Sequence, residues 1–303
     1  MLDFQRPQLS QKEEYDRILF ACPPRGCEYS FANLYLWGMQ QLVFTRGCAA
    51  FFSHFNGRSV YPYPIGPGDR RGVIEDILLD ARQRGIPCRI VSMTDADRAE
   101  LEAWFPDRFL FRTDRDSFDY VYAMDDLADL KGRRFQKKRN HVNRFRAEHP
   151  NFEFQTLDCA NMGLVQHMVN DWYRNRIRED SAGDYMLENI AMSRAFRHYV
   201  GLHMEGAALL DGGEVIAVTM GSRMGKDTFD IHFEKAREDV EGAYAAVNCE
   251  FARYLRLKYP GTVFLNREDD LGLEGLRKAK LSYNPCHMVE KQWAYLAEDI
   301  HGD

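Results

Sequence analysis

The sequence from 207 to 222, Ala-Ala-Leu-Leu-Asp-Gly-Gly-Glu-Val-Ile-Ala-Val-Thr-Met-Gly-Ser, decides the fold. Asp211-Gly212-Gly213 is a strong hairpin signal between two runs of strand-forming residues, Ala207 to Leu210 and Val215 to Ser222. A third such run, Thr228 to Phe233, follows directly. The stretch therefore predicts an antiparallel meander of three strands.

The elements around this meander follow an order that occurs twice. The second half is predicted to contain a strand at 152–157, helices at 162–178 and 185–200, the meander, a helix at 243–258, a strand at 262–266, a short helix at 273–283 and a final strand at 286–295. The first half is predicted to contain helices at 11–21 and 29–39, strands at 41–45, 48–54 and 58–63, a helix around 73–81, a strand at 88–93, a short helix from 94 to 104, and strands at 108–112 and 117–123. Each half thus predicts a mixed α/β layout in which a meander leads into one parallel crossover.

This order is similar to the acyltransferase fold of the GNAT superfamily. The resemblance implies an α/β protein with mixed sheets, built as a tandem pair of GNAT-like acyl-CoA N-acyltransferase folds. We expect an N-terminal domain at 1–125, a basic connecting helix at 126–150, and a C-terminal domain at 151–303 that holds the active centre. The alternative is an unrelated α+β protein whose halves look alike by chance.

Composition excludes several classes of protein. The 303 residues carry a formal charge of -6 and are 45% hydrophobic, which is unlike a disordered chain. No apolar stretch approaches the roughly 20 residues of a membrane-spanning helix, and the polar N-terminus does not resemble a signal peptide. The seven cysteines contain no CxxC pair and match no zinc framework. We therefore expect a cytoplasmic protein with reduced cysteines and no metal.

A strongly basic segment lies between Lys131 and Ala147. It holds eight cationic side chains and no acidic one, although the whole chain is acidic. A solvated helix face explains such a run, and so does a site for RNA phosphates, a nucleotide cofactor or anionic lipid headgroups. The candidate anion-binding residues are Arg133, Arg134, Lys137, Lys138 and Arg139.

The densest group of reactive side chains runs from Asn266 to Tyr283. Three consecutive carboxylates follow an apolar strand, and after two glycines comes a helix with three cations. A carboxylate there can take a proton from an attacking amine or hydroxyl, and a cation can stabilise an oxyanion. The candidate catalytic residues are Glu268, Asp269, Asp270, Arg277 and Tyr283, and the candidate substrate-binding residues are Asn266, Lys278, Lys280, His232, Glu234 and Gly242. The alternatives are a structural ion-pair network for the charges and core packing for Tyr283.

Three motifs resemble the family named for the C-terminal domain of phosphatidylglycerol lysyltransferase. They are Asn266-Arg-Glu-Asp-Asp-Leu-Gly with Gly275-Leu-Arg-Lys-Ala-Lys-Leu-Ser-Tyr, Lys131-Gly-Arg-Arg-Phe-Gln-Lys-Lys-Arg-Asn-His, and Phe31-Ala-Asn-Leu-Tyr-Leu-Trp. The resemblance implies transfer of an aminoacyl group from aminoacyl-tRNA to an amine or hydroxyl acceptor, such as a small molecule or a lipid headgroup. It also implies that the C-terminal motif lines the active centre and that the basic segment holds the tRNA acceptor end. The chain lacks the membrane helices of lipid-modifying members, so membrane contact would be peripheral.

A coenzyme-A-dependent N-acyltransferase is the main alternative. In such an enzyme, the pyrophosphate of acetyl-CoA or another acyl-CoA would bind at Asp239-Val-Glu-Gly-Ala-Tyr. Only Gly242 in this stretch matches the pyrophosphate-binding motif of GNAT acetyltransferases, and the two carboxylates disfavour binding of an anion. The first half offers Gly66-Pro-Gly-Asp-Arg-Arg at the equivalent place, which is equally typical of a turn before a helix. A third possibility is a non-catalytic RNA- or anion-binding protein with this fold. We expect no tightly bound cofactor.

Overall fold

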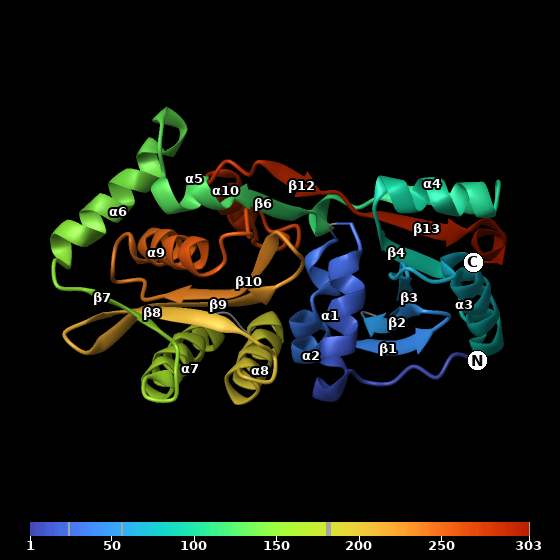
Figure 1. Cartoon of the computed structure of the whole chain (residues 1–303), viewed down its shortest axis with the longest axis horizontal. Coiled ribbons are helices and arrows are strands. Elements are labelled where there is room, and N and C mark those ends of the chain that lie inside the picture. The colour runs from blue at the N-terminus through green and yellow to red at the C-terminus, as the bar shows by residue number, and fades with distance from the viewer. Residues whose placement is uncertain (24, 56, 180–182, 303) are drawn as a thin grey trace. The chain divides into compact units, whose positions relative to one another are not determined.

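The computed structural model describes residues 1–23, 25–55, 57–179 and 183–302 (Figure 1). The chain forms two compact units, each built from separate segments. The first unit comprises Met1–Asp119, Asp269–Leu276 and Met288–Asp303, and the second comprises Tyr120–Glu268 and Arg277–His287.

The first unit is built on a sheet of six strands in the order β1-β2-β3-β4-β13-β5. Strands β1 to β3 form an antiparallel meander, and β3 pairs with β4 in parallel. Its elements are η1 (Leu9–Gln11), α1 (Lys12–Ala21), η2 (Cys27–Tyr29), α2 (Phe31–Trp37), β1 (Gln40–Thr45), β2 (Cys48–Phe55), β3 (Arg58–Pro62), α3 (Arg70–Arg84), β4 (Arg89–Met93), α4 (Asp95–Trp104), β5 (Phe109–Thr113), η3 (Arg115–Ser117), β13 (Gln292–Leu296) and η5 (Ala297–Gly302).

Local capping signals set the ends of two helices of the first unit. Gly85 adopts the left-handed conformation (φ 67°) that ends α3, and Thr94 with Asp97 forms the capping box that begins α4. The apolar face of α3, with Val73 and Ile77, packs in a core that also holds Tyr61.

The second unit holds a sheet of seven strands in the order β12-β6-β11-β10-β9-β8-β7. Strands β7 to β10 are antiparallel, and β10 pairs with β11 in parallel. Its elements are β6 (Asp119–Ala123), α5 (Met124–Asp129), η4 (Arg133–Phe135), α6 (Gln136–Glu148), β7 (Glu153–Thr156), α7 (Met162–Glu179), α8 (Gly183–Arg197), β8 (Glu205–Asp211), β9 (Glu214–Arg223), β10 (Thr228–Ala236), α9 (Ala243–Lys258), β11 (Phe264–Asn266), α10 (Glu274–Leu281) and β12 (His287–Val289).

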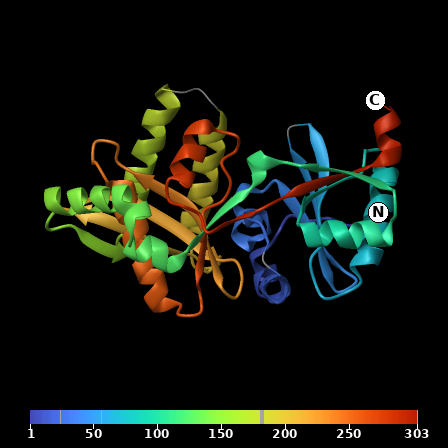
Figure 2. The same cartoon turned by 90° about the horizontal axis from the view of Figure 1, so that it is seen from above.

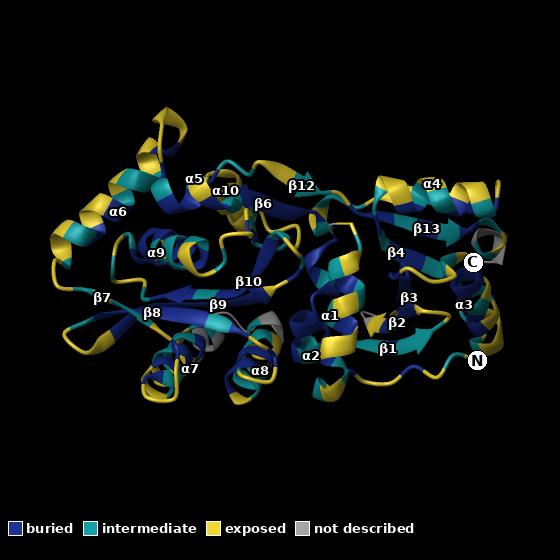
Figure 3. Cartoon of the chain, in the orientation of Figure 1, coloured by how far each residue is buried: buried dark blue, intermediate teal, exposed yellow. Residues whose placement is uncertain are grey.

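Helices cover both faces of this second sheet. Figure 1 shows α9 on one face and α7 and α8 on the other. Phe229 of β10 packs on Phe251 of α9, whereas Lys235 of β10 reaches Glu188 of α8. Figures 2 and 3 show the same arrangement from above and the resulting burial of β8 to β10. The central strands are therefore buried on both faces.

The predicted final strand at 286–295 is wrong in one respect. The structure has two strands there, and they belong to different sheets: β12 lies at the edge of the second sheet, and β13 lies between β4 and β5 of the first. Likewise β6, predicted to close the first half, pairs with β11. Hydrophobic periodicity identifies a strand but not its partner, and these pairings join residues far apart in the chain.

The compact units therefore differ from the expected ranges of 1–125, 126–150 and 151–303. The segment at 126–150 contains α6, as expected, but α6 lies within the second unit and packs on α9. Two C-terminal segments belong to the first unit. In the part of the chain that the structure describes, no helix combines the length and apolarity that crossing a membrane requires.

Candidate active site

The two parallel strands of the second sheet part just beyond Asn266. Strands β10 and β11 are paired at only three positions, the last being Asp230 with Asn266. Strand β10 then continues through a bulge between Ile231 and Phe233, while β11 ends. The buried Asn266 side chain accepts a hydrogen bond from the backbone N–H of Glu268 at 2.7 Å and so fixes the turn that follows.

A buried polar chain spans the two strands at this point. His232 lies in the β10 bulge, and its Nε2 is 2.8 Å from Ser222 Oγ of β9. Its Nδ1 is 3.2 Å from Glu268 Oε1 and 3.5 Å from Asp230 Oδ2. The register explains the meeting, because Asp230 is paired with both Ser222 and Asn266, so positions 232 and 268 each lie two residues further on.

Proton positions in this chain follow from donor chemistry. An ionised carboxylate only accepts hydrogen bonds, so Nδ1 of His232 carries the proton that faces Glu268. In the neutral ring Nε2 is then an acceptor, and the Ser222 hydroxyl donates to it. The exposed fraction is 1% for the His232 side chain, 0% for Asp230 and 21% for Glu268. Glu268 is thus the most accessible of these three groups.

The same three side chains have the composition of a metal site. Asp230, His232 and Glu268 can each offer one ligand atom, and these atoms lie within 4.8 Å of one another. A metal on Nδ1 would require the opposite proton placement, with Nε2–H donating to Ser222.

A second group of side chains surrounds Arg267 in the second unit. Its guanidinium donates to Glu234 Oε1 at 2.8 Å and stacks over the Tyr283 ring at 4.7 Å. Lys138 Nζ lies 3.8 Å from the centre of the same ring. Burial and the nearby Arg267 lower the pKa of Lys138 to about 8, and burial raises the pKa of Tyr283 to about 12. The group therefore contains a lysine whose charge is easily lost and a tyrosine that keeps its proton.

The three consecutive carboxylates do not share one environment. Glu268 belongs to the second unit, whereas Asp269 and Asp270 belong to the first. Asp270 is fully buried, accepts the Gly272 N–H at 2.9 Å and lies 3.5 Å from Arg115. Its contacts are those of a residue that shapes the turn.

The remaining C-terminal candidates lie on or beside α10. Arg277 is half-buried and Lys278 is exposed. Lys280 donates from Nζ to the backbone carbonyl of Arg267, and its own carbonyl accepts the Tyr122 hydroxyl at 2.8 Å. Lys280 therefore stabilises the segment after β11 that carries Glu268.

The helix N-terminus at Gly242 is not an open phosphate-binding site. It lies at the N-terminus of α9 with φ 82°, and a Cβ there would lie 2.5 Å from the carbonyl oxygen of His141 in α6. Glu241, beside it, pairs with Arg144 of α6. Helix α6 thus covers the start of α9.

Most cations of the basic segment have partners in the structure. Arg134 pairs with Asp126 at 2.6 Å, and Arg139 donates to the backbone carbonyls of Leu130 and Gly132. Within the described chain, Arg133 and Lys137 are exposed and make no ion pair.

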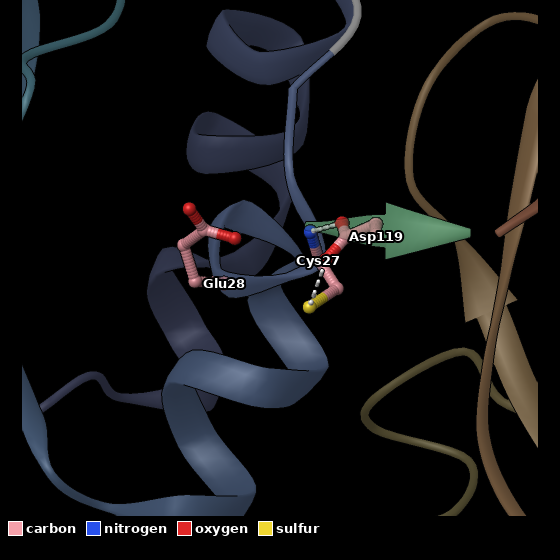
Figure 4. Close-up of side chains that lie close together, drawn as sticks. All are labelled: Cys27, Glu28 and Asp119. Carbon is pink, nitrogen blue, oxygen red and sulfur yellow. Dashed lines mark hydrogen bonds between the residues drawn. The ribbon is translucent and has the colours of Figure 1, made fainter. Parts of the chain in front are cut away.

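A second buried acidic cluster lies in the first unit. Figure 4 shows Cys27, Glu28 and Asp119, with the Cys27 backbone N–H donating to Asp119 at 2.6 Å. These side chains could also offer metal ligands, but Lys291 Nζ lies 2.6 Å from both carboxylates. Burial favours loss of the charge, yet Asp119, Cys27 and Glu28 hold the pKa of Lys291 well above its usual value. The ammonium therefore occupies the position that a metal ion would need.

Sequence analysis missed three residues of the second-unit site: Ser222, Asp230 and Arg267. One signal was present, because Asp230, His232 and Glu234 alternate with Ile231 and Phe233 in a strand that is otherwise apolar. Polar residues at a spacing of two mark one face of a strand.

Comparisons with known proteins agree with this fold. The family model described as phosphatidylglycerol lysyltransferase, C-terminal, matches residues 21–295. A conserved protein of unknown function from Bacteroides thetaiotaomicron is 33% identical, with a TM-score of 0.92 over 98% of this chain and 100% of that one. The structure of L-PGS from Bacillus licheniformis is 15% identical, with a TM-score of 0.69 over 98% of this chain and 94% of that one.

One curated relative, an uncharacterized protein from Mycoplasmoides gallisepticum, is 22% identical over 180 residues. The match covers 58% of this chain and 55% of that protein, so the chain matches only about half the length of this relative. The mixed α/β fold with two mixed sheets expected from the element order is confirmed, and the L-PGS structure shares it.

Proposed function

The chain belongs to the family described as phosphatidylglycerol lysyltransferase, C-terminal, and from that premise we propose that it transfers an aminoacyl group from aminoacyl-tRNA to a hydroxyl or amine acceptor. At the level of family, the protein is an acyltransferase. The donor, the acceptor, and a cytoplasmic location where charged tRNA is available are the parts that we propose.

The observation that carries the choice of donor is the covered N-terminus of α9. Acyl-CoA enzymes of this fold class would bind pyrophosphate where helix N–H groups are open. Here a Cβ at Gly242 would lie 2.5 Å from His141 O, and the neighbouring carboxylates of Asp239 and Glu241 are paired with Arg237 and Arg144. The residues present do not fit a pyrophosphate group, which favours a donor other than coenzyme A.

The equivalent place in the first unit is closed as well. Asp69 caps α3 by accepting the Gly72 N–H at 2.9 Å, so a carboxylate already lies at that helix start. A Cβ on Gly68 would lie 1.9 Å from Arg46 O, because the loop packs on the β1–β2 turn. This loop is therefore a helix-capping turn.

The site where β10 and β11 part supplies the chemistry that transfer needs. The ester of aminoacyl-tRNA is already activated, so catalysis requires positioning and removal of one proton. In the proposed reaction the pair of His232 and Glu268 takes the proton of the attacking hydroxyl or amine and returns it to the leaving ribose oxygen. The exposed cations Arg133 and Lys137 contact tRNA phosphates.

The test compares two donors with the full-length protein. Transfer RNA charged with a radiolabelled amino-acid mixture is incubated with phosphatidylglycerol vesicles or with small amines, and loss of label from tRNA is followed. We expect protein-dependent transfer from tRNA and no rise in melting temperature with acetyl-CoA. Stabilisation by acetyl-CoA, with acetyl transfer and no use of tRNA, would overturn the proposal in favour of a coenzyme A enzyme. Binding of tRNA without transfer would indicate a non-catalytic RNA-binding protein.

A further inference from the structure

Ser222 has the surroundings of an activated nucleophile. Its hydroxyl oxygen is 2.8 Å from His232 Nε2, and the other ring nitrogen faces Glu268 at 3.2 Å and Asp230 at 3.5 Å. A nucleophile, a base within hydrogen-bond reach and a carboxylate that orients the base are the three parts of nucleophilic catalysis. The carboxylates keep the proton on Nδ1, so Nε2 is free to accept the serine proton.

The position of Ser222 in the sheet agrees with this role. It is paired with Asp230 near the end of β9, beside the point where β10 and β11 part. The proposed function places the acyl group at that point. Ser222 is only 3% exposed, and Glu268, which contacts the other ring nitrogen of His232, is 21% exposed.

We propose that Ser222 carries the acyl group as a transient serine ester, which makes the transfer a two-step reaction; the inference rests on the proposed function. In the first step Ser222 Oγ bonds to the carbonyl carbon, and the bond from that carbon to the ribose oxygen breaks. The serine proton passes to His232 Nε2 and then to the ribose oxygen. In the second step the acceptor attacks the serine ester, and its proton returns through His232 to Ser222 Oγ.

The chain contains a matched control. Ser59 Oγ lies 3.0 Å from His54 Nδ1, but among the described residues no carboxylate pairs with His54. This pair has the nucleophile and the base without the group that orients the base. It should therefore not react as Ser222 does.

The experiment treats the full-length protein with small probes, because Ser222 is largely enclosed. Phenylmethanesulfonyl fluoride is followed by tandem mass spectrometry, and p-nitrophenyl acetate by its burst of nitrophenolate. We expect one adduct per chain on Ser222, a labelling rate at least about 100-fold lower in His232→Gln, and an unchanged rate in Ser59→Ala and after treatment with a chelator. The peptide map of the wild-type protein identifies the residue even if Ser222→Ala does not fold.

Four results would overturn the inference: no adduct, an adduct only elsewhere, an equal rate in His232→Gln, or loss of labelling with the chelator. The last would indicate a metal on Asp230, His232 and Glu268. If the protein uses aminoacyl-tRNA but forms no Ser222 adduct, the proposed function stands as a direct transfer and the serine ester is contradicted. If Ser222 forms an adduct but the protein does not use aminoacyl-tRNA, Ser222 is still a nucleophile and the proposed donor is contradicted.

Discussion

Two buried acidic clusters in this protein contain similar side chains and differ in what neutralises them. In the first unit Glu28 and Asp119 both contact the Lys291 ammonium at 2.6 Å. In the second, Asp230 and Glu268 face the imidazole of His232. The Lys291 ammonium completes two ion pairs and keeps its proton, whereas the imidazole also contacts the Ser222 hydroxyl through its second ring nitrogen. Buried carboxylates alone therefore do not identify an active site.

The parallel strand pairs of the two units also differ in the side chains that lie beside them. Strands β3 and β4 are paired at Tyr61 with Ile90, and the Tyr29 hydroxyl donates to the backbone carbonyl of Tyr63 there at 3.0 Å. The corresponding pair in the second unit carries Asp230, His232 and Glu268. We therefore assign a structural role to the first of these strand pairs and the proposed chemistry to the second.

The largest effect should come from removing the ammonium in Lys291→Met. Two buried carboxylates would lose their partner, which typically costs about 3–5 kcal/mol. Urea unfolding followed by circular dichroism measures the change. The control Lys131→Met removes a cation that is 84% exposed and should cost less than about 1 kcal/mol. Equal costs for the two variants would show that the Lys291 ammonium does not stabilise the first-unit cluster.

A smaller loss of stability is expected for Asp270→Asn. The variant weakens the contact with Arg115 and the hydrogen bond from the Gly272 N–H, for about 1–3 kcal/mol. Asp107→Asn, an exposed change at a positive φ that Asn tolerates, should stay within about 0.5 kcal/mol. Transfer activity at a temperature where Asp270→Asn is folded should persist. Loss of transfer activity without loss of stability would indicate that Asp270 is a catalytic residue after all.

The half-buried Lys138 and the buried Lys291 should respond oppositely to pH. The pKa of Lys138 is lowered to about 8, so between pH 8 and about 10.4 the unfolded state binds more protons and the stability of the wild-type protein should rise relative to Lys138→Met. The pKa of Lys291 is raised, so its contribution is present below the unfolded pKa and is lost only as pH rises through the folded value. Urea midpoints of wild type and Lys138→Met at pH 7, 8 and 10 test the first sign. A flat difference would contradict it.

The smallest effect concerns the exposed cations of the basic segment. Losing two phosphate contacts in Arg133→Gln/Lys137→Gln should reduce the slope of log affinity for tRNA against log salt by about 1.4–1.8. Filter binding between 50 and 200 mM salt, on the order of the range where such slopes are measured, is a sufficient test. Arg58→Gln/Arg112→Gln removes two exposed cations of the first unit and is the matched control. If both double variants change the slope equally, the segment has no special role.

The sequence predicted the positions of helices and strands more successfully than it predicted which strands pair. Runs of apolar residues located nearly every helix and strand, since periodicity and caps are local properties, as at Gly85 and Thr94. The exchange of β6 and β13 between sheets was not predictable, because strand pairing depends on side chains distant in sequence. For the same reason Glu268 and Asp270, which are two residues apart, were expected in one site, yet they belong to different units.

Only part of the candidate site could be predicted from the sequence. Glu268 and His232 were identified by residue type and place, but the meeting of His232 with Ser222 depends on the register between β9 and β10. The ion pairs of the basic segment could not be predicted, because their acidic partners, such as Asp126 and Glu241, lie outside it.

The central claim is that the parting of β10 and β11 in the second unit is the transfer centre. The most direct measurement is the rate at which aminoacyl-tRNA is consumed by Glu268→Gln and by Glu28→Gln, each a buried-cluster glutamate changed to its neutral counterpart, at a temperature where both are folded. We expect a loss of about 100-fold or more in Glu268→Gln and a rate within a few fold of wild type in Glu28→Gln. An unchanged rate in Glu268→Gln, or an equal loss in both variants, would contradict it.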